Sequence, residues 1–114
     1  MLDHEKLDVY QVSIEFMAIA VDIANSIPKG YSSLADQLKR AAWSVPLNIA
    51  EGCGKNGIND KKRFYSISRG SAMECAAIID VCKVLKMDEG DRFKQGKNLL
   101  TRIVAMLTKL IQHR

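Results

Sequence analysis

The segment 38–52 has the most informative pattern of hydrophobic and polar positions in the chain. At about 100° per residue, one apolar stripe of a helix is formed by Leu38, Ala41, Ala42, Val45 and Ile49. A second apolar stripe, away from the first, consists of Trp43, Leu47 and Ala50. A polar stripe of Arg40, Ser44, Asn48 and Glu51 lies between them. Because a helix of a small monomer normally buries one apolar stripe, the second stripe predicts a contact with another subunit.

The first helix is predicted from Asp8, which can cap it, to Ile27, and it has a similar surplus of apolar positions. One stripe consists of Val9, Val12, Phe16, Ile19, Ala20, Ile23 and Ile27, and an adjoining stripe of Tyr10, Ile14, Met17, Val21 and Ala24. Together they span about 220° of the helix, roughly twice the minimum for a helix that faces a core. Either this helix lies at the centre of a bundle, or its second stripe meets another subunit. We favour the subunit contact because segment 38–52 has the same surplus.

Two further amphipathic segments predict helices. The third helix follows Asn59 or Asp60, either of which can cap it, and runs to about Met87. Its expected core face consists of Phe64, Ile67, Cys75, Ile78, Val81, Cys82 and Leu85. The fourth helix starts at the cap residue Asp88, and its apolar face consists of Phe93, Leu99, Leu100, Ile103, Met106, Leu107, Leu110 and Ile111.

These segments predict an all-α protein. The second helix is expected to start at Ser32 or Ser33, which are suitable cap residues. Pro46 lies inside it and deletes one backbone hydrogen bond, which predicts a kink near Ala42–Trp43; a break into two helices is the alternative. Residues 1–114 are therefore expected to form a single domain, an up-down-up-down antiparallel four-helix bundle.

Polar residues lie within the expected core face of the third helix. Ser71 and Glu74 fall on that face, and Gly70 lies at its edge, where it would let two helices approach closely. A buried carboxylate needs a partner, and Arg40 of the second helix is the obvious candidate. We predict a buried polar clasp that fixes the register of the helices, with a pocket for a small ligand or phosphate as the alternative. The clasp consists of Arg40, Ser44, Asn48, Glu51, Ser71 and Glu74.

The charge of the chain is mildly basic and unevenly distributed. The formal charge is +4 and the pI about 9.1. Residues 8–27 contain three acids and no base, whereas residues 55–69 contain five bases and one acid, Asp60. The five bases, which we expect to meet nucleic-acid phosphates, are Lys55, Lys61, Lys62, Arg63 and Arg69. A looser basic group in the fourth helix consists of Arg92, Lys94, Lys97, Arg102, Lys109 and Arg114. The polar face of that helix is interpreted as solvated, with nucleic-acid contact as the alternative, and consists of Lys94, Asn98, Thr101, Arg102, Lys109 and Gln112.

Residues that catalysis or metal binding would need do not occur together. His4 and His113 lie near the ends of the chain, and no third residue could orient either of them. Cys75 and Cys82 share one helix face, which predicts reduced cysteines packed in a core. No Cys-x-x-Cys or Glu-x-x-His motif is present. We therefore predict no enzyme, no cofactor and no metal site.

The segment Gly52-Cys-Gly54-Lys-Asn-Gly57 matches the glycine pattern of dinucleotide-binding loops. Such a loop needs a preceding strand, and here a helix precedes it, so the glycines are expected to end the helix in left-handed conformations. The charged N-terminal residues Met1–Lys6 do not look like a signal peptide, and no apolar run approaches the ~18 residues of a membrane span. We expect a cytoplasmic protein without membrane contact.

Two motifs carry a resemblance that covers nearly the whole chain. They are Arg40-Ala-Ala-x-Ser44-Val-Pro-x-Asn48-Ile-Ala-Glu51-Gly52 and Phe64-Tyr-x-Ile67-x-x-Gly70-Ser71-x-x-Glu74. The chain resembles the four-helix bundle proteins encoded in intervening sequences of 23S ribosomal RNA genes, which are similar to the accessory variability determinants of diversity-generating retroelements. The resemblance implies an up-down bundle, a ring-shaped homopentamer and, in the retroelement branch, nucleic-acid binding, with no established catalysis. Position 76 is Ala where the family often has a second acid, which argues against a paired-carboxylate metal site.

The leading hypothesis is a non-enzymatic homo-oligomer, pentameric by resemblance, that binds RNA or DNA through its basic surfaces, with RNA favoured. The alternative is a scaffold that binds a protein partner and no nucleic acid. The residues expected at the contact between copies are Tyr10, Ile14, Met17, Val21, Trp43 and Leu47.

Overall fold

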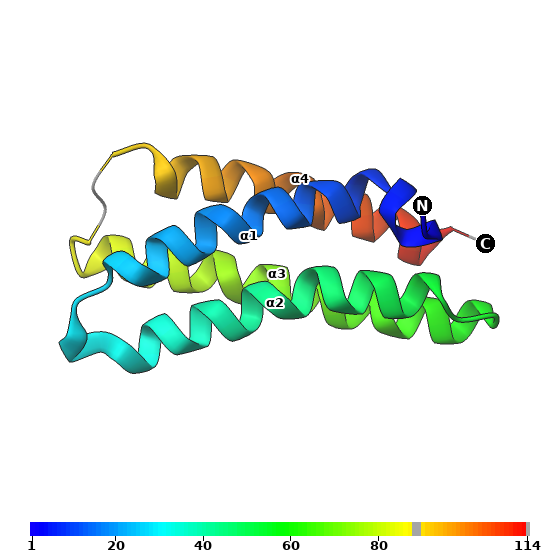
Figure 1. The fold of residues 1–114 in the computed structure, drawn as a ribbon, viewed down its shortest axis with the longest axis horizontal. Coiled ribbons are helices and arrows are strands. Elements are labelled where there is room, and N and C mark those ends of the chain that lie inside the picture. The colour runs from blue at the N-terminus through cyan, green and yellow to red at the C-terminus, as the bar shows by residue number, and fades with distance from the viewer. Residues whose placement is uncertain (88–89, 114) are drawn as a thin grey trace.

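Four long helices account for most of residues 1–87 and 90–113, which the computed structural model describes (Figure 1). They are α1 (Asp8–Ser26), α2 (Ser32–Cys53), α3 (Ile58–Val84) and α4 (Arg92–Gln112). Short 3₁₀ turns at Asp3–Lys6 and Lys29–Tyr31 precede α1 and α2. No strand occurs in the described ranges. No helix formed by these residues is both long and apolar enough to cross a bilayer.

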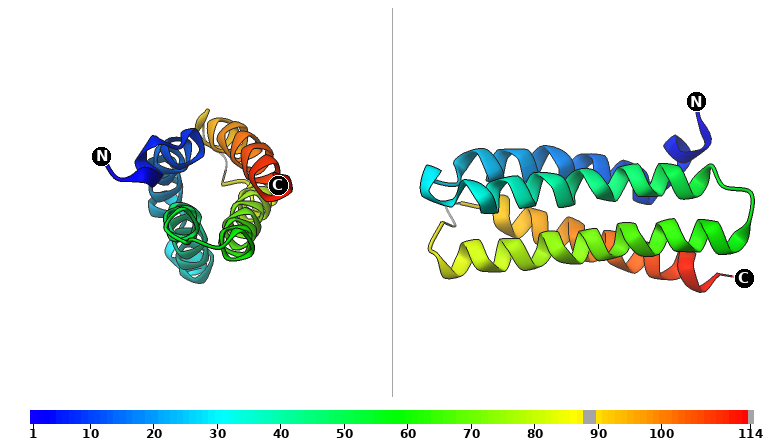
Figure 2. Two further views of the ribbon diagram at one scale, coloured as in Figure 1. Left: turned by 90° about the vertical axis from the view of Figure 1, so that its right-hand side faces the viewer. Right: turned by 90° about the horizontal axis from the view of Figure 1, so that it is seen from below.

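The helices form an antiparallel up-down-up-down bundle, as the sequence predicts. Each helix packs against two neighbours, in the pairs α1–α2, α2–α3, α3–α4 and α4–α1, and α1 makes no such contact with α3. Viewed along the bundle axis, the four helices surround a common centre (Figure 2). The connection between α2 and α3 lies at the same end of the bundle as both chain termini (Figure 1). This arrangement places the start of α3 beside the end of α4.

The helix boundaries differ from the predicted ones by a few residues. Asp8 and Ser32 are the first residues of their helices rather than caps, and Gly57 is the N-cap of α3 in place of Asn59 or Asp60. The N-cap of α4 is Asp91, whereas the predicted cap Asp88 lies outside the described residues. None of the four N-caps makes a side-chain hydrogen bond. The cap signals of the sequence therefore fix the boundaries only approximately.

The α2 helix continues without interruption past Pro46, so the alternative of two separate helices is wrong. The kink near Ala42–Trp43 stays a prediction. One turn of α2 at this point is tied to α3, because the buried Ser68 hydroxyl donates a hydrogen bond of 2.8 Å to the carbonyl oxygen of Val45. A buried hydroxyl needs such a partner, and here the partner is the backbone of the neighbouring helix.

The predicted core face of α3 is partly wrong. Phe64 is only half-buried, and Ile67, Val81 and Leu85 are 42%, 45% and 39% exposed. The residues of α3 that are buried are Tyr65, Ser68, Ala72, Cys75, Ile78, Ile79 and Cys82. Small residues occupy the centre of this face because α3 packs closely against α2, and larger apolar side chains are left outside. Cys75, Ile78 and Cys82 are buried as predicted.

The close approach of α2 and α3 depends on Gly52. A Cβ atom at this position would lie 2.9 Å from Cε1 of the buried Tyr65 ring and 3.1 Å from Cβ of Phe64. The predicted left-handed conformations of this glycine segment are wrong: the C-cap residue Gly54 has φ −79°, and in the described ranges only Lys86 and Gly90 have positive φ. Gly52 is therefore needed for space rather than for backbone freedom.

We predict that Gly52→Ala lowers the free energy of unfolding by about 1–2 kcal/mol, because the new methyl group must displace the Tyr65 ring. Gly70→Ala is the control: Gly70 lies inside α3, and a methyl group added there would meet no atom within 4 Å, so it should raise stability by about 0.5–1 kcal/mol. Urea unfolding at one protein concentration measures both. Equal effects of the two substitutions would contradict this explanation of Gly52.

Candidate nucleic-acid interface

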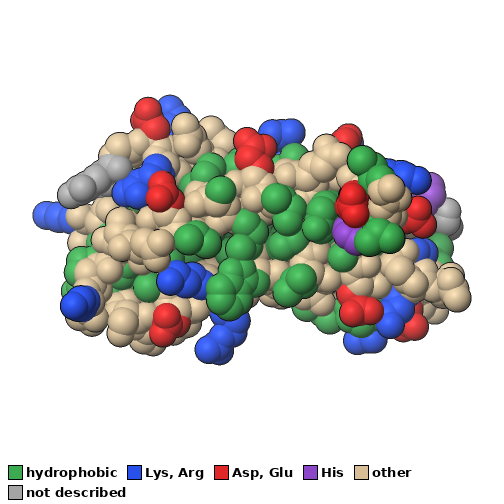
Figure 3. Space-filling view, viewed as in Figure 1, with side chains coloured by type: hydrophobic (Ala, Val, Ile, Leu, Met, Phe, Trp, Pro, Cys, Tyr) green, Lys and Arg blue, Asp and Glu red, His purple; other side chains and the backbone are tan. Residues whose placement is uncertain are grey.

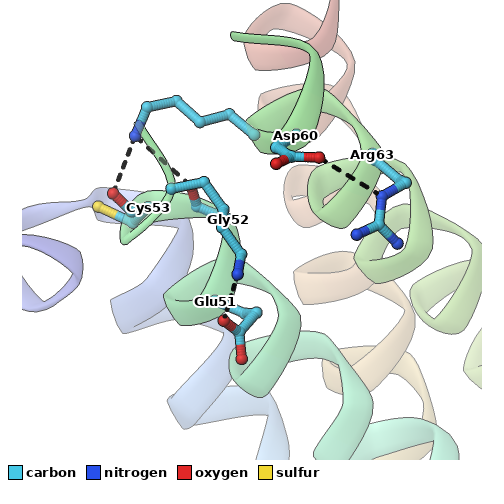
Figure 4. Close-up of polar contacts among 7 residues, drawn as sticks. Glu51, Gly52, Cys53, Asp60 and Arg63 are labelled. Carbon is cyan, nitrogen blue, oxygen red and sulfur yellow. Dashed lines mark hydrogen bonds and ion pairs between the residues drawn. The ribbon is translucent and has the colours of Figure 1, made fainter. Parts of the chain in front are cut away.

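Polar contacts where α2 ends and α3 begins involve three of the five predicted phosphate-binding residues, Lys55, Lys61 and Arg63 (Figure 4). Lys61 is used within the protein, because its Nζ donates to the carbonyl oxygens of Cys53, at 2.9 Å, and Gly52, at 3.5 Å. These carbonyls belong to the last turn of α2, where that of Gly52 also accepts the backbone N–H of Lys55 at 3.1 Å, so the Lys61 ammonium caps the helix end and complements its dipole. Lys61 therefore has a structural role.

Lys55 and Arg63 both lie over the half-buried ring of Phe64. The Nζ of Lys55 is 5.2 Å from the centroid of the Phe64 ring, and the guanidinium carbon of Arg63 is 4.4 Å from it. Each also faces a carboxylate: Lys55 is 3.3 Å from Glu51, and Arg63 is 3.8 Å from Asp60. These exposed pairs contribute little stability, but they offset the charge of both cations.

Lys62 and Arg69 lie on the side of α3 that faces α4. The Nε of Arg69 donates a hydrogen bond of 2.9 Å to the hydroxyl of Thr108 on α4. Lys62 is half-buried and makes no hydrogen bond or ion pair with the part of the chain that the structure describes. The structure thus divides the five predicted residues into a group at the end of the bundle and a pair beside α4.

No acidic residue occurs in residues 61–73 of α3 or anywhere in α4, Arg92–Gln112. Two cations of α4 pair with other helices: Arg92 lies 3.7 Å from Asp22 of α1, and Lys97 pairs with Asp80 of α3. Lys94, Arg102 and Lys109 are exposed, and Arg114 lies outside the described residues. Residues 61–73 of α3 and the second half of α4, which are antiparallel neighbours, therefore form a surface that has no carboxylate of its own.

The predicted buried polar clasp is only partly present. Its three uncharged members are half-buried and bonded to one another: Asn48 Nδ2 donates to Ser44 Oγ at 2.9 Å, and Ser71 Oγ donates to Ser44 Oγ at 2.7 Å. Asn48 Nδ2 also donates to the Ser44 carbonyl, at 2.8 Å.

The three charged members of the clasp were predicted wrongly. Arg40, Glu51 and Glu74 are exposed, and within the described residues Arg40 and Glu74 form no ion pair. Because α3 is rotated relative to the prediction, Cys75 rather than Glu74 points to the core, and the carboxylate stays in water at no desolvation cost. Gly70 is exposed and meets no neighbour, so its predicted role in close packing is also wrong. Four of the clasp residues, together with Gln37 and Ala41, line an open pocket of about 190 Å³ between α2 and α3; they are Arg40, Ser44, Ser71 and Glu74.

The surplus apolar stripes of α1 and α2 lie at the surface. Trp43 and Leu47 are 49% and 67% exposed, Ile14 is 46% exposed, and Tyr10, Met17 and Val21 are half-buried. We call these six residues the α1–α2 patch. Figure 3 shows hydrophobic side chains gathered over α1 and α2 on this face of the bundle. Three large exposed apolar side chains, Ile14, Trp43 and Leu47, thus belong to one patch with three half-buried ones.

A second exposed apolar surface runs along α3, and sequence reasoning placed two of its residues, Ile67 and Val81, in the core. Its residues lie on the outer side of α3 and are Ile67, Ala77, Val81 and Val84, with the exposed Gly70 and Glu74 between Ile67 and Ala77; we call the four apolar residues the α3 outer stripe. Val84 is 80% exposed. Because α2 packs against both α1 and α3, the fold fixes the position of this stripe relative to the α1–α2 patch.

The two buried cysteines are packed in the core in the reduced form, as predicted. Burial raises the pKa of the Cys75 thiol to about 12, and the neighbouring Glu74 carboxylate adds to this effect. Burial also raises the pKa of Cys82. The third cysteine, Cys53, is half-buried at the end of α2.

We predict that native protein at pH 8 reacts rapidly with a thiol reagent at Cys53 alone, because Cys75 and Cys82 are buried and protonated. Unfolded Cys75 would ionise near its ordinary pKa of 9.0, and the folded thiol only near 12, so its contribution to stability should fall as pH rises between these values. A colorimetric thiol count with and without denaturant measures the reactivity. The Cys53→Ser control should then show no rapidly reacting thiol, and one or two in that variant would contradict the prediction.

Comparisons with known proteins give one family and one fold. The sequence model of the family described as 23S rRNA-intervening sequence protein matches residues 5–109. A crystal structure of a protein with unknown function from the S23 ribosomal protein family of Bacteroides thetaiotaomicron VPI-5482 is similar, with a TM-score of 0.83 over 91% of this chain and 98% of that chain. The two sequences are 19% identical, so this similarity concerns the fold. No curated protein matches the chain.

Proposed function

Because the chain belongs to the family of 23S rRNA-intervening sequence proteins, whose sequence model matches residues 5–109, we propose that it assembles and binds nucleic acid as the family resemblance implies. The protein is a non-enzymatic bundle that assembles in the cytoplasm into a ring of five copies and binds nucleic acid, RNA in particular, through basic surfaces. The observation that carries this proposal is the separation of apolar and basic surfaces: the α1–α2 patch lies on one side, and the carboxylate-free surface of α3 and α4 on another.

The two exposed apolar surfaces support a ring rather than a symmetric dimer. A dimer with a two-fold axis uses one patch twice, whereas a ring joins one surface of each copy to a different surface of the next. The α1–α2 patch and the α3 outer stripe are two such surfaces on different helices. Stacking the patch of one copy on the stripe of its neighbour would cover Trp43 and Leu47 on one side and Val81 and Val84 on the other. The number five comes from the family resemblance.

Assembly would strengthen the attraction between this mildly basic protein and nucleic acid. One copy has a formal charge of +4, and several of its cations face carboxylates. A ring repeats the carboxylate-free surface of each copy, so one nucleic-acid strand can meet several of them at once, and the effective concentration of each further contact is high. Phosphate contacts of this kind favour binding without reading the base sequence.

We predict that Trp43→Asp converts the assembly to a monomer with unchanged helical content. Trp43 is half exposed in the single chain, so the substitution removes no core contact but puts a charge into the proposed interface. Light scattering coupled to gel filtration should give a multiple of 12.7 kDa for the unmodified protein and one copy for the variant. Gln95→Asp, at an exposed site on α4, is the matched control and should stay assembled. A monomeric unmodified protein would overturn the ring.

We predict that the protein binds single-stranded RNA with an affinity that falls steeply as salt is raised. Each phosphate contact releases counterions and contributes a slope of about −0.7 in a plot of log K against log salt. Fluorescence anisotropy of a labelled RNA, with a DNA of the same sequence beside it, measures this dependence. Trp43→Asp should weaken binding because a monomer loses the repeated surface. The absence of binding at low salt, or binding that salt does not change, would contradict the proposal.

The α1–α2 patch also supports a second function, that of a scaffold for a protein partner without nucleic acid. An exposed apolar patch of this kind is typical of protein-protein contact sites. A pull-down from nuclease-treated extract with the unmodified protein and with Trp43→Asp separates the two functions. A partner that survives nuclease treatment and is lost with the variant would favour the scaffold.

A further inference from the structure

A small polar pocket lies between α3 and α4, away from the contacts at the end of α2. Its volume is about 220 Å³, and it is lined by Ser66, Arg69, Thr108, Ile111 and Gln112. Ser66 and Arg69 come from the first half of α3, and the other three from the last turns of α4. The pocket therefore lies within the surface that has no carboxylates.

Arg69 is held in place by a neutral group. Its Nε donates to the Thr108 hydroxyl at 2.9 Å, and that hydroxyl donates in turn to the carbonyl oxygen of Val104 at 2.7 Å. The hydroxyl thus links the guanidinium to the backbone of α4. Among the described residues only Nε of Arg69 makes a hydrogen bond, so the two terminal amino groups offer their N–H donors to a ligand. Fixing the side chain in advance lowers the entropy cost of binding that ligand.

The charge of Arg69 is not offset in the way that its neighbours' charges are. Lys55 and Arg63 face carboxylates, and Lys61 faces two carbonyl oxygens. Arg69 faces a hydroxyl, which orients it without neutralising it. The pocket includes the last turn of α4, where the helix dipole places a partial negative charge, whereas the start of α3 at Ile58 is more than two turns away; the positive potential of the pocket therefore comes from Arg69.

The other polar groups of the pocket match the same kind of ligand. Ser66 offers a hydroxyl and Gln112 a carboxamide, and both can donate hydrogen bonds to an anion. Lys62 precedes Ser66 by four residues, which places a second cation on the same side of α3 toward the end of the bundle. No carboxylate of α4 or of residues 61–73 is present to repel an anion.

We propose that this pocket binds a phosphate group, with Arg69 as the principal contact and Ser66 and Gln112 as additional donors. A guanidinium with two parallel N–H donors matches phosphate oxygens. The proposed source of the phosphate is the backbone of a bound nucleic acid, so this part of the inference rests on the proposed function. A free phosphate or a small phosphate ester presents the same oxygens, and the experiment below separates these sources.

Three variants test the pocket. Arg69→Gln removes the charge, Thr108→Val removes the anchoring hydroxyl and keeps the shape and charge, and Lys94→Gln removes an exposed charge elsewhere on α4 as the control. In the RNA titration, Arg69→Gln should weaken binding at low salt about tenfold and reduce the salt slope by about one phosphate contact, 0.7. Thr108→Val should weaken binding with an unchanged slope, since the charge remains. Lys94→Gln should leave the slope unchanged.

A second measurement does not depend on RNA. Inorganic phosphate titrated into the unmodified protein should shift the NMR signal of the Arg69 Nε–H group, and Thr108→Val should reduce this shift. Phosphate shifts together with RNA effects support the full inference. RNA binding that Arg69→Gln leaves unchanged, with no phosphate shift, would overturn the pocket and leave the proposed function standing. A phosphate shift without RNA binding would support the phosphate site but overturn nucleic acid as its source, and the proposed function with it.

Discussion

The close packing of α2 against α3 determines which residues reach the surface. Gly52 leaves room for the Tyr65 ring, and Ser68 hydrogen-bonds the Val45 carbonyl, so the small side of α3 faces α2. This sets the rotation of α3 about its axis. With Cys75 inside, Glu74 lies in water, and the apolar residues on the far side form the α3 outer stripe. A rotation by one residue would bury a carboxylate and remove one of the two apolar surfaces on which the proposed assembly depends.

The sequence predicts α1, α2 and α4 well because each has a wide apolar stripe with a clear polar side. It predicts α3 less well because large apolar residues occur on both sides of that helix. The prediction favoured Phe64, Ile67 and Val81 for their size, whereas the structure buries the smaller Ser68 and Ala72. Periodicity records where apolar residues recur, but it does not record how near the neighbouring helix is. At a close contact, small size outweighs hydrophobicity.

The candidate interface, too, can be predicted only in part from the sequence. Sequence alone identifies the five basic residues, since their concentration is visible in composition. It does not reveal what each cation contacts, because the partners are distant in sequence or belong to the backbone: Thr108 is 39 residues from Arg69, and Lys61 reaches the carbonyl of Cys53. The Lys61 ammonium therefore caps the end of α2, whereas the Arg69 guanidinium is held in place and can bind a ligand. A Thr facing an Arg across two helices carries no signal in a single sequence.

Topology converts a small net charge into a basic surface. The acids of residues 8–27 lie on α1, and the antiparallel order places α1 diagonally across the bundle from α3, whose backbone it does not approach. Residues 61–73 of α3, which include no acid, instead neighbour α4, which has no acid at all. Where a cation does face α1, its charge is offset, as that of Arg92 is by Asp22. The basic character of this surface is therefore a property of helix order rather than of composition, and a rearranged bundle with the same residues would lack it.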